Sequence, residues 1–172
     1  MSKNVLVVID MQNDFIDGAL GTKEAQTIIE NVYQVIQSFE GEVVFTRDTH
    51  FENYADTQEG KKLPIPHCIK GTNGWQINSK LKKLIKSETK IFDKITFGST
   101  ELTEYLKNNK ELEKVTLAGL CTDICIISNA LLIKSNLPEV EIEVLENCCA
   151  GVTPESHINA LNAMKMCQIS VK

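Results

Sequence analysis

The sequence has 172 residues, of which 42% are hydrophobic and 24% are charged, and its formal net charge is −5 at pH 7. This length and balance are typical of one globular domain that buries a sizeable core without disulfides or a structural metal, so we expect residues 1–172 to form a single domain. The negative charge and the aromatic content of 6% argue against nucleic acid as a partner, because a nucleic-acid groove needs basic side chains and stacking aromatic rings.

The N-terminal segment gives no sign of a membrane or secretion signal. Its apolar run, Val5–Ile9, is too short to span a bilayer and is not followed by a small-residue cleavage site. We therefore expect a cytoplasmic protein without a membrane partner. The six cysteines show neither CxxC nor zinc-finger spacing, and in a reducing compartment we expect free thiols. They are Cys68, Cys121, Cys125, Cys148, Cys149 and Cys167.

Short β-branched runs alternate with segments of helical periodicity along the whole chain. The predicted strands are 4–9, 42–46, 90–92, 115–120, 140–145 and 168–171. The predicted helices are 22–39, 78–85, 101–106, 123–134 and one that Thr153 and Pro154 open as cap and first position. This alternation predicts an α/β fold of three αβα layers, with a doubly wound, six-stranded, mostly parallel sheet.

A long polar loop, residues 47–75, interrupts this alternation. Structureless connections longer than about 12 to 15 residues are uncommon in compact domains and are often functional. The loop contains two of the three histidines, His50 and His67. The third, His157, lies in the capped helix after Thr153, and we expect it to be structural.

Ionisable side chains follow several predicted strands. Right-handed crossovers bring the carboxyl ends of parallel strands to one edge of the sheet, so Asp10, Asp48, Lys94 and Cys125 should lie near one another. Cys125 would lie in the first turn of a helix, where N–H groups favour a thiolate and can bind an oxyanion. The alternative is a small buried hydrophobic side chain. With Asp10 as base and Lys94 as a neighbouring cation, a nucleophile is the better interpretation.

The loop also offers a set of metal ligands. Asp48 and His50 are two residues apart, and His67 follows later. One carboxylate with two imidazoles suits Zn²⁺, Fe²⁺ or Mn²⁺ and leaves coordination positions open. The D-x-H spacing is weak evidence by itself, because loop histidines often bind nothing. Glu59 is a further candidate ligand, and its alternative is a solvated glutamate beside two lysines.

Five segments, taken together and in order, resemble one known family over essentially the whole chain. They are DMQNDF at 10–15, RDTH at 47–50, PHCIKGT at 66–72, FDK at 92–94 and GLCTDICI at 119–126. They are similar to the motifs of the isochorismatase-like cysteine hydrolases, and within that family to those of the nicotinamidase branch.

The resemblance implies a mechanism and a set of site residues. Asp10, Lys94 and Cys125 would be catalytic, and the backbone N–H groups of Cys121 and Cys125 would form the oxyanion hole, with a cis peptide bond before Cys121. Nicotinamide and water would give nicotinate and ammonia through a thioester on Cys125. The implied cofactor is one divalent transition metal, Zn²⁺ before Fe²⁺ or Mn²⁺, which in nicotinamidases binds the pyridine nitrogen. The resemblance also implies a dimer or a tetramer.

The substrate side of the resemblance is less complete. Phe15 matches a position that packs against the ring. Pro64 stands where nicotinamidases often have an aromatic residue, and Phe97 would substitute for the tyrosine of a segment that is shorter here, at 95–99. The third histidine ligand of some members is absent, and other members use a glutamate, for which Glu59 is the candidate.

Other functions stay open at the level of sequence. The nearest alternative is a related hydrolase for another small amide or carbamoyl compound. An enol-ether hydrolase is disfavoured by the Asp48, His50 and His67 set, because that branch needs no metal. A non-enzymatic regulatory protein is disfavoured by the intact catalytic residues. A redox sensor that uses Cys121 and Cys125 would require suitable disulfide geometry across a turn.

Overall fold

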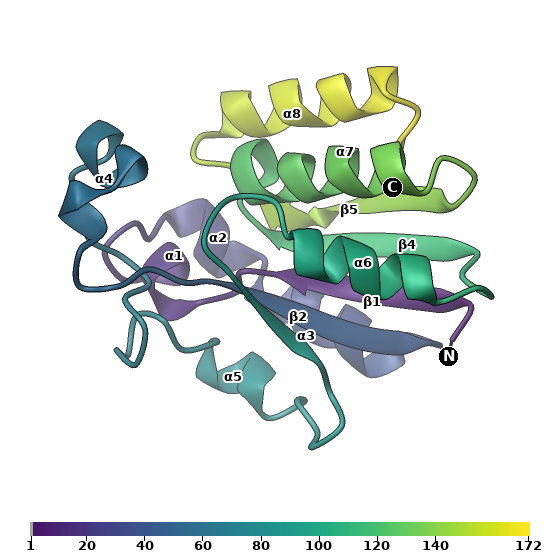
Figure 1. The fold of residues 1–172 in the computed structure, drawn as a ribbon, viewed down its shortest axis with the longest axis horizontal. Helices are drawn as coiled ribbons and strands as arrows, with labels where there is room; N and C mark the ends of the chain where they lie inside the picture. Colours follow the sequence, from purple (N-terminus) through teal and green to yellow (C-terminus); the bar gives the residue numbers. More distant parts are fainter. Residues whose placement is uncertain (1) are drawn as a thin grey trace.

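The computed structural model describes residues 2–172 (Figure 1). Within these residues six strands form one sheet in the order β3-β2-β1-β4-β5-β6, and every neighbouring pair is parallel. The strands are β1 Asn4–Ile9, β2 Glu42–Asp48, β3 Ile91–Lys94, β4 Lys114–Leu120, β5 Glu141–Ala150 and β6 Ser170–Val171. The chain starts in the middle of the sheet, winds outward to β3, and then returns past β1 to build the other half. The predicted doubly wound α/β fold is confirmed.

Helices cover both faces of the sheet and give the three expected layers (Figure 1). One face carries α2 Lys23–Thr27, α3 Ile29–Ser38 and α5 Ser79–Lys82, and the other carries α6 Thr100–Asn108, α7 Ile127–Asn136 and α8 Pro154–Met166. The short elements near the carboxyl ends of the strands are α1 Asn13–Ile16, η1 Tyr54–Asp56, α4 Gln58–Lys62 and η2 Thr122–Ile126.

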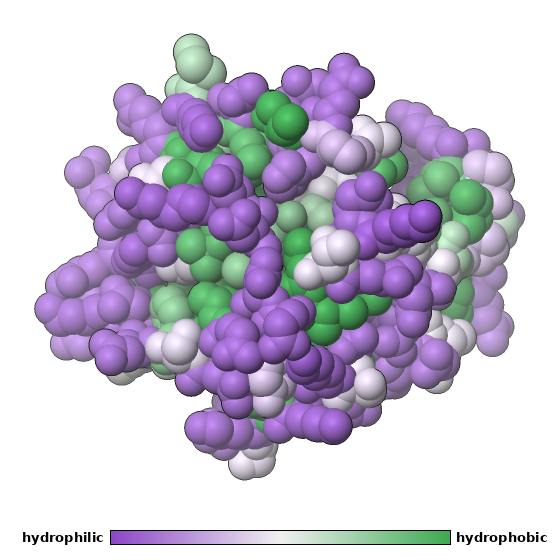
Figure 2. All heavy atoms as spheres, turned by 180° about the vertical axis from the view of Figure 1, so that it is seen from behind, coloured by the Kyte–Doolittle hydropathy of each residue, from purple (hydrophilic) through white to green (hydrophobic). Residues whose placement is uncertain are grey.

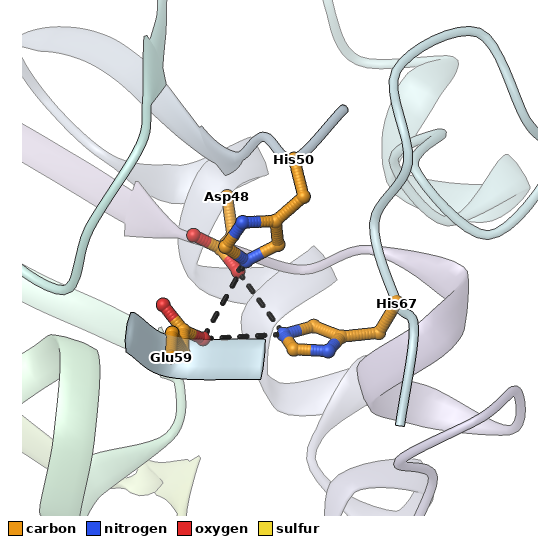
Figure 3. Close-up of side chains that lie close together, drawn as sticks. All are labelled: Asp48, His50, Glu59 and His67. Atoms are coloured by element: carbon orange, nitrogen blue, oxygen red, sulfur yellow. Dashed lines mark hydrogen bonds and ion pairs between the residues drawn. The ribbon is translucent and has the colours of Figure 1, made fainter. Parts of the chain in front are cut away.

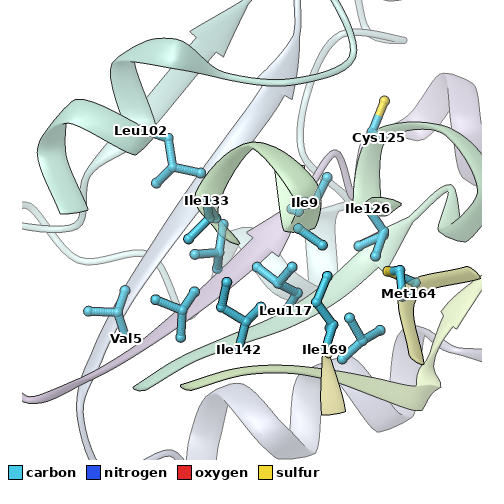
Figure 4. Close-up of a cluster of buried hydrophobic side chains, with 14 of the residues drawn as sticks. Val5, Ile9, Leu102, Leu117, Cys125, Ile126, Ile133, Ile142, Met164 and Ile169 are labelled. Atoms are coloured by element: carbon cyan, nitrogen blue, oxygen red, sulfur yellow. The ribbon is translucent and has the colours of Figure 1, made fainter. Parts of the chain in front are cut away.

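Two apolar cores lie on the two faces of the sheet, which explains the continuous apolar run of β1. Val5, Val7 and Ile9 pack into the cluster beneath α6, α7 and α8, which Figure 4 shows. Leu6 and Val8 point to the opposite face, toward α2 and α3. Successive side chains of a strand alternate between faces, so a strand that is covered on both sides needs apolar residues throughout.

The surface is largely hydrophilic on the face shown in Figure 2, with apolar side chains visible only between polar ones. No helix in residues 2–172 is both long enough and apolar enough to cross a membrane.

Several element boundaries differ from the prediction. The helix predicted over 22–39 is divided at Ile28 into α2 and α3. The helix predicted over 78–85 stops at Lys82, because the next amides bond to carbonyls only three residues back, as Leu84 does to Leu81 at 2.9 Å. The expected structureless loop 47–75 contains η1 and α4. The start of α8 at Pro154 agrees with the prediction, and a Thr153 capping box stabilises it.

Candidate active site

Asp10 lies at the carboxyl end of the central strand β1 and is fully buried. Its φ of 48° is in the left-handed region, which aspartate tolerates better than most residue types. The Thr46 hydroxyl on β2 donates a hydrogen bond to Asp10 Oδ1 at 2.6 Å. The carboxylate is thus held on one side by the neighbouring strand, and Oδ2 faces the next residue of the site.

Lys94 ends β3, and its buried ammonium joins three side chains of the site. Lys94 Nζ lies 2.6 Å from Asp10 Oδ2 and 3.4 Å from Asp48 Oδ1. It also lies 3.4 Å from Cys125 Sγ and donates to the Thr96 carbonyl at 3.0 Å. The predicted convergence of Asp10, Lys94 and Cys125 at one edge of the sheet is therefore present in the structure.

Cys125 lies in a tight turn between β4 and α7. The turn begins after Gly119, whose φ is +126° and where a Cβ atom would lie 2.0 Å from the Ile9 carbonyl oxygen, so only glycine fits. The peptide bond between Leu120 and Cys121 is cis, as the resemblance implied. The Cys121 carbonyl accepts bonds from the amides of Ile124 and Ile126.

This turn differs from the prediction for Cys125. The residue lies in the π-helical η2, whereas the sequence predicted the first turn of an α-helix. The physical reason is the bond from the Ile126 amide to the carbonyl five residues before it, which widens the turn. The assignment of the Cys121 and Cys125 amides to an oxyanion hole stays a prediction.

Burial and charge act in opposite directions on these groups. Burial raises the pKa of Cys125 well above its usual value, against the attraction of Lys94. Burial likewise raises the pKa of Asp10 despite the nearby ammonium. Burial alone would lower the pKa of Lys94. The attraction of Asp10, Cys125 and Asp48 is stronger than this effect and raises the pKa of Lys94. Burial thus favours the neutral forms of Cys125 and Asp10, whereas the surrounding negative groups favour the charged form of Lys94.

Asp48, His50, Glu59 and His67 form a second cluster next to this one (Figure 3). One ligand atom from each of the four lies within 4.8 Å of the others. His50 Nε2 is 2.9 Å from Asp48 Oδ2 and 3.5 Å from Glu59 Oε1, and His67 Nε2 is 3.5 Å and 3.7 Å from the same two oxygens. Glu59, the further candidate ligand from the sequence, lies on α4 and joins the other three.

Hydrogen bonds orient the imidazole of His67 in the cluster. His67 Nδ1 lies 2.8 Å from the Ile65 carbonyl, which can only accept, so Nδ1 carries a proton and Nε2 is the ring nitrogen that faces Asp48 and Glu59. Burial and the charge of Asp48 raise the pKa of Glu59. Burial alone would raise the pKa of Asp48, but the hydrogen bonds that Asp48 accepts from His50 and His67 lower it. Two carboxylates and two imidazoles whose donor atoms converge are an appropriate ligand set for one divalent transition metal.

The two clusters open into one cavity of about 300 Å³. This volume is within the range of small-molecule sites, which are apolar with a few placed polar groups. Phe15 and Phe97, for which the resemblance implied contact with a substrate ring, are both on its wall. The lining residues are Phe15, Leu20, Asp48, Gln58, Glu59, Lys62, Leu63, His67, Thr96, Phe97, Cys121, Ile124 and Cys125.

Comparison with known proteins agrees with this geometry. A family model described as the Isochorismatase domain matches residues 4–171. The chain belongs to the isochorismatase family. It is a hydrolase of that family, and the resemblance found in the sequence motifs is confirmed.

Individual isochorismatase relatives cover nearly the whole chain. An uncharacterized isochorismatase family protein PncA of Bacillus subtilis is 31% identical over 174 residues, which cover 93% of each chain. A crystal structure of nicotinamidase PncA from Bacillus subtilis matches with a TM-score of 0.85 at 28% identity, and covers 98% of each chain. The pyrazinamidase of Pyrococcus horikoshii in complex with zinc has a TM-score of 0.84 at 28% identity, covering 99% of this chain and 98% of that one.

Several residues of this isochorismatase site did not stand out in the sequence. The buried Gln12 amide accepts from the Asp48 amide at 2.7 Å and donates to the Asp48 and Trp75 carbonyls at 2.8 and 2.9 Å. The Tyr54 ring packs edge-on against both imidazoles of the second cluster. His157, expected to be structural, lies 2.7 Å from the Thr122 hydroxyl of the Cys125 turn through its Nδ1. The DMQNDF motif contains Gln12 and was the available signal for it. The motif does not reveal that Gln12 bonds to Asp48 and Trp75.

Proposed function

We propose that this isochorismatase-family hydrolase is an amidohydrolase of the nicotinamidase type, which converts nicotinamide and water to nicotinate and ammonia. One observation carries the proposal above all others. The Cys125 thiol, with Lys94 and Asp10 behind it, opens into the same cavity as Asp48, Glu59 and His67. A ring amide of modest size can therefore lie with its carboxamide at the thiol and its ring toward the second cluster.

In the proposed reaction Asp10 is the base. It takes the proton of Cys125, and the thiolate attacks the carboxamide carbon. The tetrahedral oxyanion is assigned to the backbone amides of Cys121 and Cys125. The C–N bond then breaks, Asp10 returns the proton to the leaving ammonia, and a thioester remains on Cys125. Water attacks the thioester with Asp10 again as base, nicotinate leaves, and the proton returns to the thiol.

Lys94 supports the proposed proton transfers without taking part in them. Its ammonium contacts Asp10, Asp48 and Cys125. It therefore stabilises the negative charge on Asp10 before the proton transfer and on Cys125 after it. Its bond to the Thr96 carbonyl fixes the ammonium in the site.

Asp48, His50, Glu59 and His67 are proposed to hold one divalent ion, with Zn²⁺ first and Fe²⁺ or Mn²⁺ as alternatives. The support is the convergence of their four donor atoms and the orientation of the His67 ring. A bound ion would supply a Lewis acid in the same cavity as the thiol, suited to a ring nitrogen. Phe15 and Phe97 are proposed to pack against the ring from the cavity wall.

The proposal also covers the setting of the reaction. The chain is proposed to act as one isochorismatase-like domain, in the cytoplasm, as a dimer or a tetramer. The family match over residues 4–171 and the single sheet support one domain. Size-exclusion chromatography with light scattering measures the oligomeric state, and a monomer at micromolar concentration would contradict that part of the proposal.

The deciding experiment is ammonia release from nicotinamide by the zinc-loaded protein. We expect Cys125→Ala to abolish release, because Cys125 is the cavity thiol that contacts Lys94, at 3.4 Å. Chelation should also abolish it, and added zinc should restore it. Cys167→Ala is the matched control, since this cysteine is exposed and outside the cavity, and it should keep full activity.

Each alternative result has a defined meaning. Release that survives Cys125→Ala would contradict the thioester mechanism, and release that survives complete chelation would contradict the metal requirement. If the zinc-loaded wild-type protein releases no ammonia from nicotinamide, the nicotinamidase assignment is wrong, and pyrazinamide and small carbamoyl compounds become the next substrates to test.

A further inference from the structure

A buried amide in the first turn of α7 connects the Cys125 turn to the loop between β3 and α6. Asn129 is fully buried and is followed by the apolar residues Ala130 and Leu131. Its Nδ2 donates to the Cys125 carbonyl at 2.8 Å and to the Phe97 carbonyl at 3.0 Å, and its Oδ1 accepts from the Ser99 amide at 2.9 Å. The catalytic steps proposed above do not use this residue.

These three partners determine the orientation of the amide group. Both donor hydrogens meet carbonyl oxygens, which can only accept, and the oxygen meets a backbone N–H, which can only donate. If the amide group were turned by 180°, its oxygen would face the carbonyl oxygens of Cys125 and Phe97. The Asn129 side chain therefore has a single arrangement that satisfies its surroundings, and this arrangement ties the loop between β3 and α6 to the Cys125 turn.

The loop between β3 and α6, residues 95–99, is held at its end by Ser99, whose Oγ accepts from the Leu102 amide at 3.1 Å and whose carbonyl accepts from the Thr103 hydroxyl at 2.9 Å. The Thr96 carbonyl accepts from Lys94, and Gly98 passes close to α7, where a Cβ atom would lie 3.3 Å from Leu132 Cδ2. The side chain of Phe97 is 42% exposed, so its own packing does not fix it. Between Thr96 and Ser99, the Phe97 backbone is thus held by the bond that its carbonyl accepts from Asn129.

We propose that Asn129 is a positioning residue that sets how the Phe97 side of the cavity lies relative to the Cys125 thiol, and so governs the placement of a ring-bearing substrate. The proposal rests on the proposed function for its choice of amide substrate. An error of about 1 Å in such placement can cost roughly 100-fold in rate, which is why a residue without contact to the reacting atoms can control turnover.

The first test uses nicotinamide hydrolysis by Asn129→Ala and Asn129→Thr. The threonine hydroxyl can still bond the carbonyl four residues back, but it is too short to hold the 95–99 loop. We expect both variants to raise KM for nicotinamide about tenfold and to lower kcat per titratable Cys125 thiol. A merely structural role would reduce the amount of folded enzyme and leave KM and kcat per thiol unchanged.

The matched control is Asn136→Ala. Asn136 lies on the same helix and makes the same kind of bond, from Nδ2 to the Leu132 carbonyl at 2.9 Å, but it is exposed and far along the helix from the 95–99 loop. Its replacement should leave KM and kcat as they are in the wild-type protein. An equal effect of Asn136→Ala and Asn129→Ala would overturn the proposal.

A second readout does not depend on nicotinamide. Alkylation of Cys125 by iodoacetamide and by its N-phenyl derivative can be followed at this residue by peptide mass spectrometry. The ratio of the two rates reports whether a ring finds its place beside Phe97. We expect Asn129→Thr to lower this ratio about fivefold, the scale of one aromatic contact, while the iodoacetamide rate changes little.

The two readouts separate the two proposals. Failure of the wild-type protein to hydrolyse nicotinamide would overturn the proposed function only, because the alkylation ratio still tests Asn129. An unchanged ratio in both Asn129 variants, with folded protein shown by a cooperative thermal transition, would overturn the positioning role whatever the substrate is.

Discussion

Lys94 is the residue on which the charges of the site depend. Its ammonium is buried between Asp10 and Asp48, at 2.6 and 3.4 Å. Lys94→Met would leave two buried carboxylates without their cation, and loss of one partner of a buried ion pair costs about 3 to 5 kcal/mol. We expect the free energy of unfolding to fall by that order and nicotinamide hydrolysis to be lost, as measured by urea denaturation and ammonia release.

A second lysine in an ion pair provides the control for this change. Lys107 lies 2.8 Å from Glu104, and the two side chains are 39% and 62% exposed. Lys107→Met should therefore cost only about 0 to 1 kcal/mol and leave hydrolysis intact. Equal stability losses in the two variants would show that Lys94 is not held by the charges described.

The proton affinity of Asp10 predicts a pH dependence. Burial raises its pKa above the ordinary value of 3.8. Because the proposed role of Asp10 as base requires its carboxylate form, kcat/KM should fall as the pH falls through this raised pKa. The measurement is the pH profile of nicotinamide hydrolysis, with the zinc content determined at each pH so that loss of metal is separated. Constant kcat/KM down to pH 4 with zinc retained would contradict the prediction.

Some residues of the site could be predicted from the sequence, and others could not. Asp10, Lys94 and Cys125 could be placed together because each follows or ends a strand of a parallel sheet, and topology alone brings such positions to one edge. Gln12 and Asn129 could not be predicted, because each acts through backbone groups of distant segments, as Gln12 does on Asp48 and Trp75. No side-chain pattern in the sequence records those partners.

At the scale of elements, the short helix α4 connects the cavity to the candidate metal cluster. It carries Glu59, and its start is capped by Thr57, whose Oγ1 accepts from the Gly60 amide at 3.0 Å. Gly60 packs directly against η1, where a Cβ atom would lie 2.0 Å from the Tyr54 carbonyl oxygen. The helix therefore depends on this close contact to present Glu59 to the cluster.

Gly60→Ala should consequently weaken metal binding. The added methyl group must move α4 away from η1 and Glu59 away from the histidines, and we expect zinc affinity to fall about tenfold or more, as for changes in residues that support metal ligands. Competition with a chromophoric chelator measures the affinity. Lys61→Ala, an exposed change in the same helix, should bind zinc normally. Unchanged affinity in Gly60→Ala would show that the position of α4 does not matter for the ion.

Elements of this kind are where sequence prediction was weakest. The long strands and α8 followed from apolar runs and the Thr153 cap, but η1, α4 and the π-turn η2 span only three to five residues. Isolated helices of that length are unstable in water, so tertiary contacts such as the one at Gly60 decide whether they form. The sequence of residues 47–75 shows polarity and histidines, and the contacts are visible only in the fold.

At the scale of the whole molecule, the strand order explains why the site lies where it does. The chain reverses direction of winding between β1 and β4, and the two connections that leave these strands diverge there. Asp10 follows β1 and the Cys125 turn follows β4, while β2 and β3 bring Asp48 and Lys94 from one side. This arrangement was predictable, because alternating strands and helices with right-handed crossovers allow few other topologies.

Metal binding should stabilise the entire fold, since its proposed ligands join the sheet to the 47–75 segment. Asp48 ends the inner strand β2, whereas Glu59 and His67 belong to the segment that follows it. An ion that binds only the folded chain stabilises it by about 2.7 kcal/mol at 100 times its Kd. For a chain of this size that corresponds to a rise of about 5 to 10 °C in Tm on zinc loading. Differential scanning calorimetry with zinc and with chelator measures the rise. Glu59→Gln should reduce the rise in Tm, and Cys125→Ala should show the same rise as the wild-type protein. Equal Tm values with and without zinc in the wild-type protein would contradict the proposed metal site.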